Sequence, residues 1–432
     1  MARDPNAGDG RGDGPGATRR RLLTTGAGLA GAASGLLGAG RARADAGANL
    51  PPDVPQWQKQ QGAGILSPPY GVPSPHEAKV VRRLRAVGKP PATRVAAFSV
   101  TPLQDLAGII TPNGLHYERH HAGVPAIDPD QHRLLVHGLV ERPLIFSMAE
   151  LTRFPSVSRL HFLECSGNSP FAGEKLPGLT VQDTHGLLSC CEWTGVALST
   201  VLAEAGVKPQ AKWLLAEGAD AAAMARSIPI EKALDDAILA YAQNGERLRP
   251  EQGYPLRLLL PGWEGNTSVK WLRRLKLGTM PFETRDETAK YTMIMPDDTI
   301  RQFNFVMEAK SVITFPSGGQ QLRERGFYEI SGLAWSGSGS IRRVEVTTDG
   351  GATWREAALQ EPVLPKCLTR FRLPWHWDGG PAQLASRATD TTGYVQPSRA
   401  ALAKIRDARS YYHNNAIQTW ALAPDGRVTN AG

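Results

Sequence analysis

The sequence has little cysteine, and its cysteines are not spaced as redox or haem motifs require. Only Cys165, Cys190, Cys191 and Cys367 occur in 432 residues. These are too few for a disulfide framework in so long a chain, and a bridge between the neighbours Cys190 and Cys191 would be strained. No CxxC and no CxxCH occurs, which excludes a thioredoxin-like site and a covalently attached c-type haem. We interpret Cys190, Cys191 and Cys367 as buried thiols with no ligand role.

Long apolar runs, and basic runs with interleaved aromatics, are absent as well. The apolar stretch at 22–40 is too short and too rich in glycine to cross a membrane, so no span is expected in the mature chain. The net charge is +8, but the first 45 residues carry part of it. Nucleic-acid binding is therefore not expected, whereas a basic pocket for an anionic substrate stays open.

The first 44 residues have the features of an export signal. Arginines at 19–21 precede the weakly apolar run, and the tripeptide ARA at 42–44 offers a small-x-small cleavage site. This order is typical of the twin-arginine route, with an ordinary secretory signal or a basic tail as the alternatives. Twin-arginine export predicts a periplasmic protein that folds before transport, often around a cofactor.

The remaining chain changes character along its length. Residues 45–95 are rich in Pro, Gln and Gly and are predicted to be an extended arm, and residues 411–432 a C-terminal tail. Residues 96–285 mix strands with a helix and are predicted to form an α+β domain. Its expected strands lie at 132–140, 159–165, 212–218, 255–263 and 269–277, and its expected helix at 196–206.

Residues 286–410 show a different pattern, with short strands, almost no helix, and turns rich in Gly, Ser and Asp. This pattern predicts a β-sandwich of immunoglobulin type. The sequences SGSGS (336–340) and DGG (349–351) are expected to be hairpin turns. No strand of this region carries an evident catalytic cluster, so we interpret it as an interaction or dimerisation domain.

The stretch HFLECSGNSP (161–170) places Cys165 at the end of an expected strand, before a turn. At such a position the thiol has four interpretations: nucleophile, half of a disulfide, metal ligand or small core residue. Thiolate is a soft donor that suits a redox metal, and Gly167 lets a bulky ligand approach the backbone. If Cys165 is a nucleophile instead, His161 or a more distant histidine would be its base. A binding module built on the sandwich is a third, non-catalytic alternative.

Three other segments carry polar residues at comparable turns. They are LHYERHHAGVP (115–125), YPLRLLLPGWEGNTSVKW (254–271) and RDETAKYTM (285–293). Each is weak alone, because an adjacent His pair is more often structural than a zinc site. The loop after 261 also lacks the spacing of a nucleotide P-loop.

Taken together and in this order, the segments resemble the sulfite oxidase family of molybdopterin enzymes over roughly residues 96–410. The family motif C-A/S-G-N after a strand is matched at 165–168, and its aromatic-x-R-N-H segment at 117–121, with His120 replacing Asn. Its S-I-P segment is matched at 227–229, with Asp220 as the preceding acid. The motifs P-x-R-x-x-x-P-G and V-K-W are matched at 255–262 and 269–271.

The resemblance implies a fold, a cofactor and a role for each matched residue. The fold is a sulfite-oxidase-type molybdopterin domain at 96–285 followed by an immunoglobulin-like dimerisation domain at 286–410. Cys165 would bind molybdenum, and Arg119 and Tyr291 would be the other catalytic residues. The residues implied in holding molybdopterin are Tyr117, Glu118, Arg119, His120, His121, Asp220, Gln252, Arg257, Ser268, Val269 and Lys270.

Within the family, the segments ECSGN, 185–196 and 289–298 are most similar to the molybdenum subunit of sulfane dehydrogenases, the SoxC type. Sulfite oxidases often carry arginines just after the Gly-Asn, where this chain has Ser169 and Pro170. A family tryptophan near the substrate is also replaced, in the region of Asp183 or Thr184. These departures favour sulfane sulfur presented on a carrier protein, and free sulfite is the alternative substrate.

The resemblance also implies partners for the chain. Oxygen-atom transfer to sulfur leaves electrons that must depart, and with no haem on this chain a c-type cytochrome subunit is the expected acceptor. A sulfur-carrier protein would deliver the substrate, and the C-terminal domain would hold a homodimer together.

Overall fold

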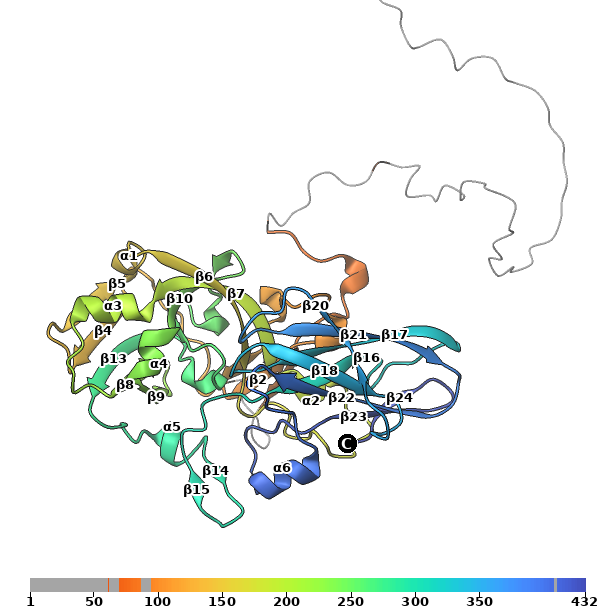
Figure 1. Cartoon of the computed structure of the whole chain (residues 1–432). Coiled ribbons are helices and arrows are strands. Elements are labelled where there is room, and N and C mark those ends of the chain that lie inside the picture. Colours follow the sequence, from red (N-terminus) through yellow and green to blue (C-terminus); the bar gives the residue numbers. More distant parts are fainter. Residues whose placement is uncertain (1–60, 62–69, 87–94, 408–409) are drawn as a thin grey trace, which may run out of the picture. The chain divides into compact units, whose positions relative to one another are not determined.

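The computed structural model describes residues 61, 70–86, 95–407 and 410–432 (Figure 1). The predicted signal at 1–44 lies outside the described residues, as does most of the predicted arm. Within Pro73–Gly432, which forms one compact unit, an α+β part is followed by a β-sandwich. The predicted fold class is therefore confirmed. None of the described helices is long and apolar enough to cross a membrane.

Two five-stranded sheets make up most of the α+β part. In the first, β13 runs parallel to β4 and the other pairs are antiparallel. Its strands, in spatial order, are β5 (Leu144–Ser147), β4 (Arg133–Gly138), β13 (Leu272–Gly278), β8 (Trp213–Gly218) and β9 (Ala225–Pro229). The second sheet has β11 (Glu246–Arg247), β10 (Ile238–Gln243), β7 (Leu188–Ala197) and β6 (Ser156–Glu164), with β12 (Arg257–Leu259) also paired to β10. Strands occur in all five predicted places.

Helix α3 (Leu198–Ala205) confirms the helix predicted at 196–206. Leu198, Val201, Leu202 and Ala205 recur at helical spacing and are all buried against the first sheet. Gly206 ends the helix at φ +72°, a left-handed conformation that glycine adopts without strain. The other α-helices are α1 (Met148–Leu151), α2 (Val181–His185), α4 (Ile230–Asp235), α5 (Arg285–Thr288) and α6 (Arg399–Ile405).

A three-stranded sheet carries the first site segment. It has the order β1 (Arg83–Ala86), β2 (Ala97–Val100) and β3 (Glu118–His120). Strand β1 lies inside the stretch predicted to be an extended arm, so 83–86 is sheet instead. Arg83 fixes it in place by pairing with Asp183 at 3.2 Å. Short 3₁₀ turns complete this part: η2 (Pro75–Glu77), η3 (Leu103–Asp105), η4 (Asn113–Leu115), η5 (Pro250–Gln252) and η6 (Gly265–Thr267).

The sandwich consists of a four-stranded and a five-stranded sheet, reached through the hairpin of β14 (Met293–Ile294) and β15 (Ile300–Arg301). The first sheet has β16 (Lys310–Phe315), β17 (Gly326–Trp335), β21 (Thr369–Trp377) and β20 (Ala358–Gln360). The second has β19 (Arg355–Glu356), β18 (Ile341–Thr347), β22 (Ala382–Asp390), β23 (Thr419–Leu422) and β24 (Val428–Asn430). Residues 411–432 are thus not a tail throughout, because β23 and β24 extend the second sheet.

One of the two predicted hairpin turns is wrong. Residues 349–351 do turn β18 into β19, but 336–340 connect β17 to β18, which belong to different sheets. Gly337 serves a close approach there: a Cβ on it would lie 1.9 Å from the carbonyl oxygen of Gly262. Glycine therefore allows the close contact between the α+β part and the sandwich at this position.

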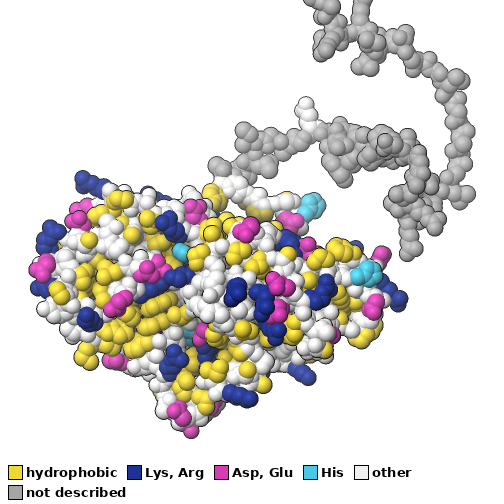
Figure 2. Space-filling model, in the orientation of Figure 1, with side chains coloured by type: hydrophobic (Ala, Val, Ile, Leu, Met, Phe, Trp, Pro, Cys, Tyr) yellow, Lys and Arg dark blue, Asp and Glu magenta, His cyan; other side chains and the backbone are white. Residues whose placement is uncertain are grey.

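On the face drawn in Figure 2, Lys and Arg side chains are interspersed with Asp and Glu.

Candidate active site

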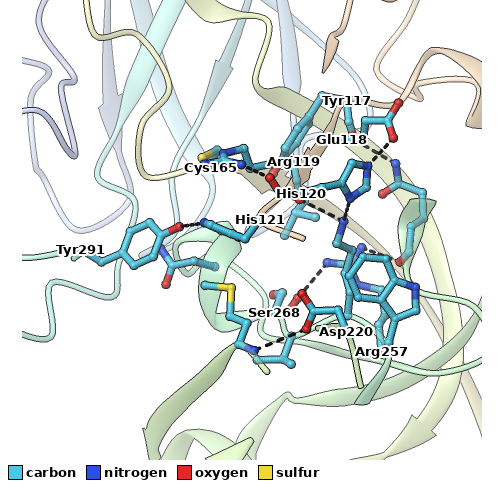
Figure 3. A pocket seen from close by; sticks show the side chains of 18 residues that line it. Tyr117, Glu118, Arg119, His120, His121, Cys165, Asp220, Arg257, Ser268 and Tyr291 are labelled. Atoms are coloured by element: carbon cyan, nitrogen blue, oxygen red, sulfur yellow. Dashed lines mark hydrogen bonds and ion pairs between the residues drawn. The ribbon is translucent and has the colours of Figure 1, made fainter. Parts of the chain in front are cut away.

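One cavity of about 650 Å³ collects every side chain that the sequence predicts for the site (Figure 3). The predicted residues that line it are Tyr117, Glu118, Arg119, His120, His121, Cys165, Asp220, Gln252, Arg257, Ser268, Val269, Lys270 and Tyr291. They come from β3 and its flanking residues, the end of β6, the loop after β8, η5, β12, the loop before β13 and the loop between α5 and β14. Segments far apart in the sequence therefore meet, as the resemblance requires.

Cys165 directly follows β6, and the backbone holds its turn at several points. Its amide donates to the carbonyl of Leu187 at 3.0 Å, and its carbonyl accepts from the amide of Asn168 at 2.8 Å. The Asn168 side chain accepts from the Leu187 amide at 3.1 Å. The thiol is thus presented to the cavity from a fixed turn, and burial raises its pKa.

Lys270 ties the loop before β13 to β3. Its ammonium donates to the carbonyls of Arg119 and Glu251, each at 3.0 Å, and to Nδ1 of His120 at 2.9 Å. Because an ammonium only donates, Nδ1 of His120 accepts, and the proton of that ring lies on Nε2, which donates to Glu118. The tautomer of His120 is thereby assigned by its two neighbours.

Arg257 is a buried cation with unused donors. Its guanidinium donates to the carbonyls of Gln252 and Ser268 at 3.1 and 3.0 Å and lies over the ring of Trp193. Its Nε has no hydrogen-bond partner among the described residues. Burial lowers the pKa of Arg257 to about 10, so the group stays charged at neutral pH. A buried cation of this kind favours an anionic ligand in the cavity.

The residues that line the cavity have a net positive charge. They include three cations, Arg119, Arg257 and Lys270, and two acids, Glu118 and Asp220. Burial, with Arg257 nearby, lowers the pKa of Lys270 to about 7, although Glu118 and Asp220 act in the opposite direction. An anion bound beside Lys270 would restore its charge. A dianionic phosphate fits this balance better than a neutral ligand does.

Tyr291 and His121 form a hydrogen-bonded pair at the end of the cavity that holds Cys165 (Figure 3). Their Oη and Nε2 atoms are 2.8 Å apart. Burial, with Arg119 nearby, lowers the pKa of His121 to about 3, so the ring is neutral and accepts from the phenol. Burial also raises the pKa of Tyr291. Its backbone has φ +55°, a left-handed conformation that costs energy in a non-glycine residue.

The residues present fit a molybdenum–pterin cofactor. The soft sulfur donor is Cys165, at one end of the cavity, and Arg257 and Lys270 supply positive charge for a phosphate. Gly265, which also lines the cavity, allows a close approach of its backbone, because a Cβ on it would lie 2.9 Å from the Tyr117 hydroxyl and 2.8 Å from the Glu164 carbonyl.

Sequence reasoning missed residues of the C-terminal segment that close over the cysteine turn. The amide of His413 donates to the Ser166 carbonyl at 2.8 Å. The ring of Tyr411 lies against Gly167, where a Cβ would come within 2.9 Å of it, and 56% of Tyr411 is exposed. Tyr412 lies beside Tyr291 with ring centroids 5.2 Å apart. The adjacent tyrosines at 411 and 412 are the sequence feature that could have identified this segment as part of the site.

The thiol-nucleophile alternative finds little support. His161 directs Nδ1 toward the carbonyl of Lys366, 3.2 Å away, and does not line the cavity. Among the described residues, no histidine hydrogen bond to Cys165 is found. Because burial raises the pKa of this thiol, it is protonated at neutral pH unless a metal binds it.

Comparisons with known proteins agree with this geometry. The family model for the oxidoreductase molybdopterin-binding domain matches residues 121–285, and the model for the Mo-co oxidoreductase dimerisation domain matches residues 301–420. A chain in the crystal structure of the sulfane dehydrogenase SoxCD from Paracoccus pantotrophus has 47% sequence identity to this chain and superposes with a TM-score of 0.84. The match covers 88% of this chain and 97% of that chain.

Curated relatives are more distant and longer. Rat mitochondrial sulfite oxidase is 31% identical over 78% of this chain and 66% of its own length. A barley NAD(P)H nitrate reductase is 33% identical over 68% of this chain and 37% of its own. Chicken sulfite oxidase is 32% identical over 70% of this chain and 72% of its own. The chain thus spans about two thirds of the sulfite oxidases and little over a third of the nitrate reductase.

Proposed function

The chain belongs to the sulfite oxidase family of molybdopterin oxidoreductases, and from this premise we propose that it oxidises sulfane sulfur carried on a partner protein. The reaction is oxygen-atom transfer in the periplasm, with electrons passed to a c-type cytochrome. The observation that carries the proposal is that Cys165, Arg119 and Tyr291 line one cavity. The same cavity contains the cations Arg257 and Lys270, which can bind an anion.

Each residue has a task that follows from its position. Molybdenum bound to molybdopterin would supply oxygen-atom transfer coupled to two-electron chemistry. Cys165 would hold the metal, and Arg257 and Lys270 would hold the phosphate of the pterin. Arg119 stabilises negative charge that develops on the oxidised sulfur. Tyr291 keeps its proton and donates it in a hydrogen bond to His121, whose neutral ring fixes where the phenol lies.

Sulfane sulfur is favoured over free sulfite by the residues after the cysteine turn. Ser169 is buried and does not line the cavity, so the position adds no positive charge where the sulfite oxidases carry arginine. Lys310, which lies 3.5 Å from the Ser169 hydroxyl, is paired with Glu164 at 2.7 Å. Tyr411 and Tyr412 instead offer polarizable aromatic surface, which suits sulfur atoms carried on a protein chain.

The location and partners follow the same reasoning. The arginines at 19–21 support twin-arginine export, and the dimerisation domain supports a homodimer. A c-type cytochrome accepts the electrons, and a sulfur-carrier protein delivers the substrate. Purification of the chain with a covalently bound haem of its own would contradict the need for the cytochrome.

Metal analysis and a substrate comparison test the proposal directly. The protein purified from the periplasm should contain about one molybdenum per chain, and it should turn over thiosulfate-loaded carrier protein. Absence of molybdenum would overturn the proposal. Rapid turnover of free sulfite at micromolar concentration, without a carrier, would make the protein a sulfite dehydrogenase instead.

Replacing the metal ligand gives the first mutational prediction. Cys165→Ser should lower turnover by more than about 100-fold, since even changes one shell further out cost about 10–100-fold. Circular dichroism and the fluorescence of released pterin should stay close to wild type. Cys191→Ser is the matched control, because Cys191 is buried beside Gln243 and does not line the cavity. Near-full activity in Cys165→Ser would contradict the assignment.

A further inference from the structure

Glu164, the residue before Cys165, is a buried carboxylate whose partners come largely from the sandwich. Its Oε1 accepts from the Lys310 ammonium at 2.7 Å, and its Oε2 accepts from the Trp335 indole at 2.6 Å. Lys310 lies on β16 and Trp335 on β17, whereas Glu164 ends β6. All three are at most 1% exposed. The C-terminal domain therefore reaches the residue that adjoins the metal ligand.

The same cluster also holds the far side of the cysteine turn. Glu164 Oε1 accepts from the Asn168 side chain at 2.9 Å, and Lys310 lies 3.5 Å from the Ser169 hydroxyl. Ser169 has φ +61°, so the turn is kept in a conformation that non-glycine residues seldom adopt. Contacts before and after Cys165 thus converge on one ion pair. None of these groups is a partner of the thiol itself.

We propose that Lys310, Glu164 and Trp335 are positioning residues, which set the geometry of Cys165 at molybdenum from the dimerisation domain. The proposal rests on the proposed function, because it assumes that Cys165 binds the metal. A buried ion pair is seldom worth more to stability than a well-packed apolar pair. The hydrogen bonds that reach Glu164 from three directions instead fix where the turn lies.

The chain contains a second ion pair across the same interface, which serves as a control. Lys366, before β21, lies 2.5 Å from Asp236, after α4, and this pair is about one quarter exposed. Neither side chain contacts residues 164–169. Removing it loosens the interface without touching the turn.

The experiment uses the full-length, molybdenum-loaded protein. The double variant Glu164→Gln/Lys310→Met removes both charges, so that no lone buried charge remains. We expect its metal and pterin content to match wild type and its Mo(V) electron paramagnetic resonance g-values to shift. Turnover should fall by about 10- to 100-fold, with the Michaelis constant little changed. Lys366→Met, which leaves Asp236 paired with Lys232, should lower the melting temperature and leave the g-values unchanged.

The possible outcomes distinguish a failure of the positioning role from a failure of the proposed function. Unchanged g-values in the double variant would overturn the positioning role, whatever happens to its stability. If the double variant fails to fold, Trp335→Phe decides, because it keeps an aromatic ring in the core and removes the indole donor to Glu164. Wild-type protein without molybdenum would instead refute the proposed function, and no variant would be needed.

Two buried thiols at this interface carry an independent inference. Cys190, on β7, and Cys367, before β21, have Sγ atoms 3.4 Å apart, and both are at most 1% exposed. The Phe162 amide, opposite Cys190 in the sheet, donates to the carbonyl of Lys366 at 3.1 Å. The backbone on both sides of the pair is therefore anchored. Cys191 points elsewhere, toward Gln243 at 3.1 Å.

We infer that Cys190 and Cys367, free thiols in this structure, form a disulfide between the two domains in an oxidising compartment. A side-chain movement of roughly 1.4 Å would bring the sulfurs to bonding distance. When the interface opens locally, one thiolate attacks the disulfide of an external oxidant, which forms a mixed disulfide and releases one thiolate of the oxidant. The second thiolate then attacks the mixed disulfide and releases the other thiolate of the oxidant. Two protons are lost, and two electrons reduce the external disulfide to thiols.

Thiol counting tests the crosslink. The chain has four cysteines, so denatured, metal-free protein taken from the periplasm should show two reactive thiols rather than four. Peptide mapping without reductant should recover the peptides of Cys190 and Cys367 joined. Cys190→Ser should expose Cys367 and give three thiols. Four reactive thiols in wild-type protein from the periplasm would overturn the inference.

Discussion

At the scale of single residues, the charge of Lys270 depends on what occupies the cavity. Burial and Arg257 lower its pKa to about 7, so the metal-free protein holds the proton below that pH and releases it above. Sulfate, which stays dianionic over this range, should therefore bind the metal-free protein several-fold more tightly at pH 6 than at pH 8. Trp271 reports the binding by fluorescence, since the ammonium lies 4.4 Å from its ring centroid.

The matched variant for this prediction is Lys270→Met. It keeps an unbranched chain of similar length and loses the charge, so sulfate affinity at pH 6 should fall about tenfold, the effect of one charged hydrogen bond. The remaining pH dependence should be small, because Arg257, with a pKa of about 10, stays protonated throughout. A pH dependence as steep as that of wild type would place the titrating group elsewhere.

At the scale of elements, the segment 410–415 is held against the cysteine turn by His413. Burial alone would lower the pKa of His413, but the carboxylates of Glu264, at 3.2 Å, and Glu308, at 3.9 Å, outweigh it and raise the pKa to about 8. The protonated ring thus stabilises the folded state. This contribution is fully present below the ordinary pKa of 6.5 and is lost as the pH rises through about 8.

The size of this effect follows from the shift. A rise from 6.5 to about 8 corresponds to about 2 kcal/mol. Urea unfolding should therefore show that wild type exceeds His413→Gln in stability by about 2 kcal/mol more at pH 6 than at pH 9. A stability difference that does not change over this range would mean that His413 stays neutral in the folded protein.

The strands and the C-terminal segment show what sequence can predict and where it stops. Residues 159–165 are followed by a turn that the glycine at 167 indicates, so β6 was predictable from the local sequence pattern. Strand β23 was not, because Thr419–Leu422 alternates over only four residues and pairs with β22, which lies far back in the sequence. Local periodicity gives no information about such long-range pairing.

The residues of the site also fall into those that the sequence identifies and those that only the fold brings to light. Residue types and short motifs identified the members of the cavity, but only the resemblance placed Lys270 near Arg119, which it bonds across 151 positions of sequence. Glu164 and Lys310 could not be found from pattern, since a buried ion pair looks like any two charges in sequence. Their relation depends on how the two domains pack.

At the scale of the whole molecule, the two domains share a hydrophobic core. Phe162, Val181 and Leu188 of the α+β part pack in one cluster with sandwich residues such as Trp335 and Phe371. A second cluster, which includes Leu202, stays within the α+β part. The shared core means that neither domain can lose its packing without exposing apolar surface of the other.

Unfolding of the full-length chain should therefore be one cooperative event. Calorimetry should show a single transition whose calorimetric and van't Hoff enthalpies agree. Leu188→Ala, in the shared core, and Leu202→Ala, in the second cluster, should each cost about 2–5 kcal/mol and shift that whole transition downward. If Leu202→Ala split off a separate transition at lower temperature, the domains would unfold independently. The sandwich would then be a weak support for a catalytic turn in the neighbouring domain.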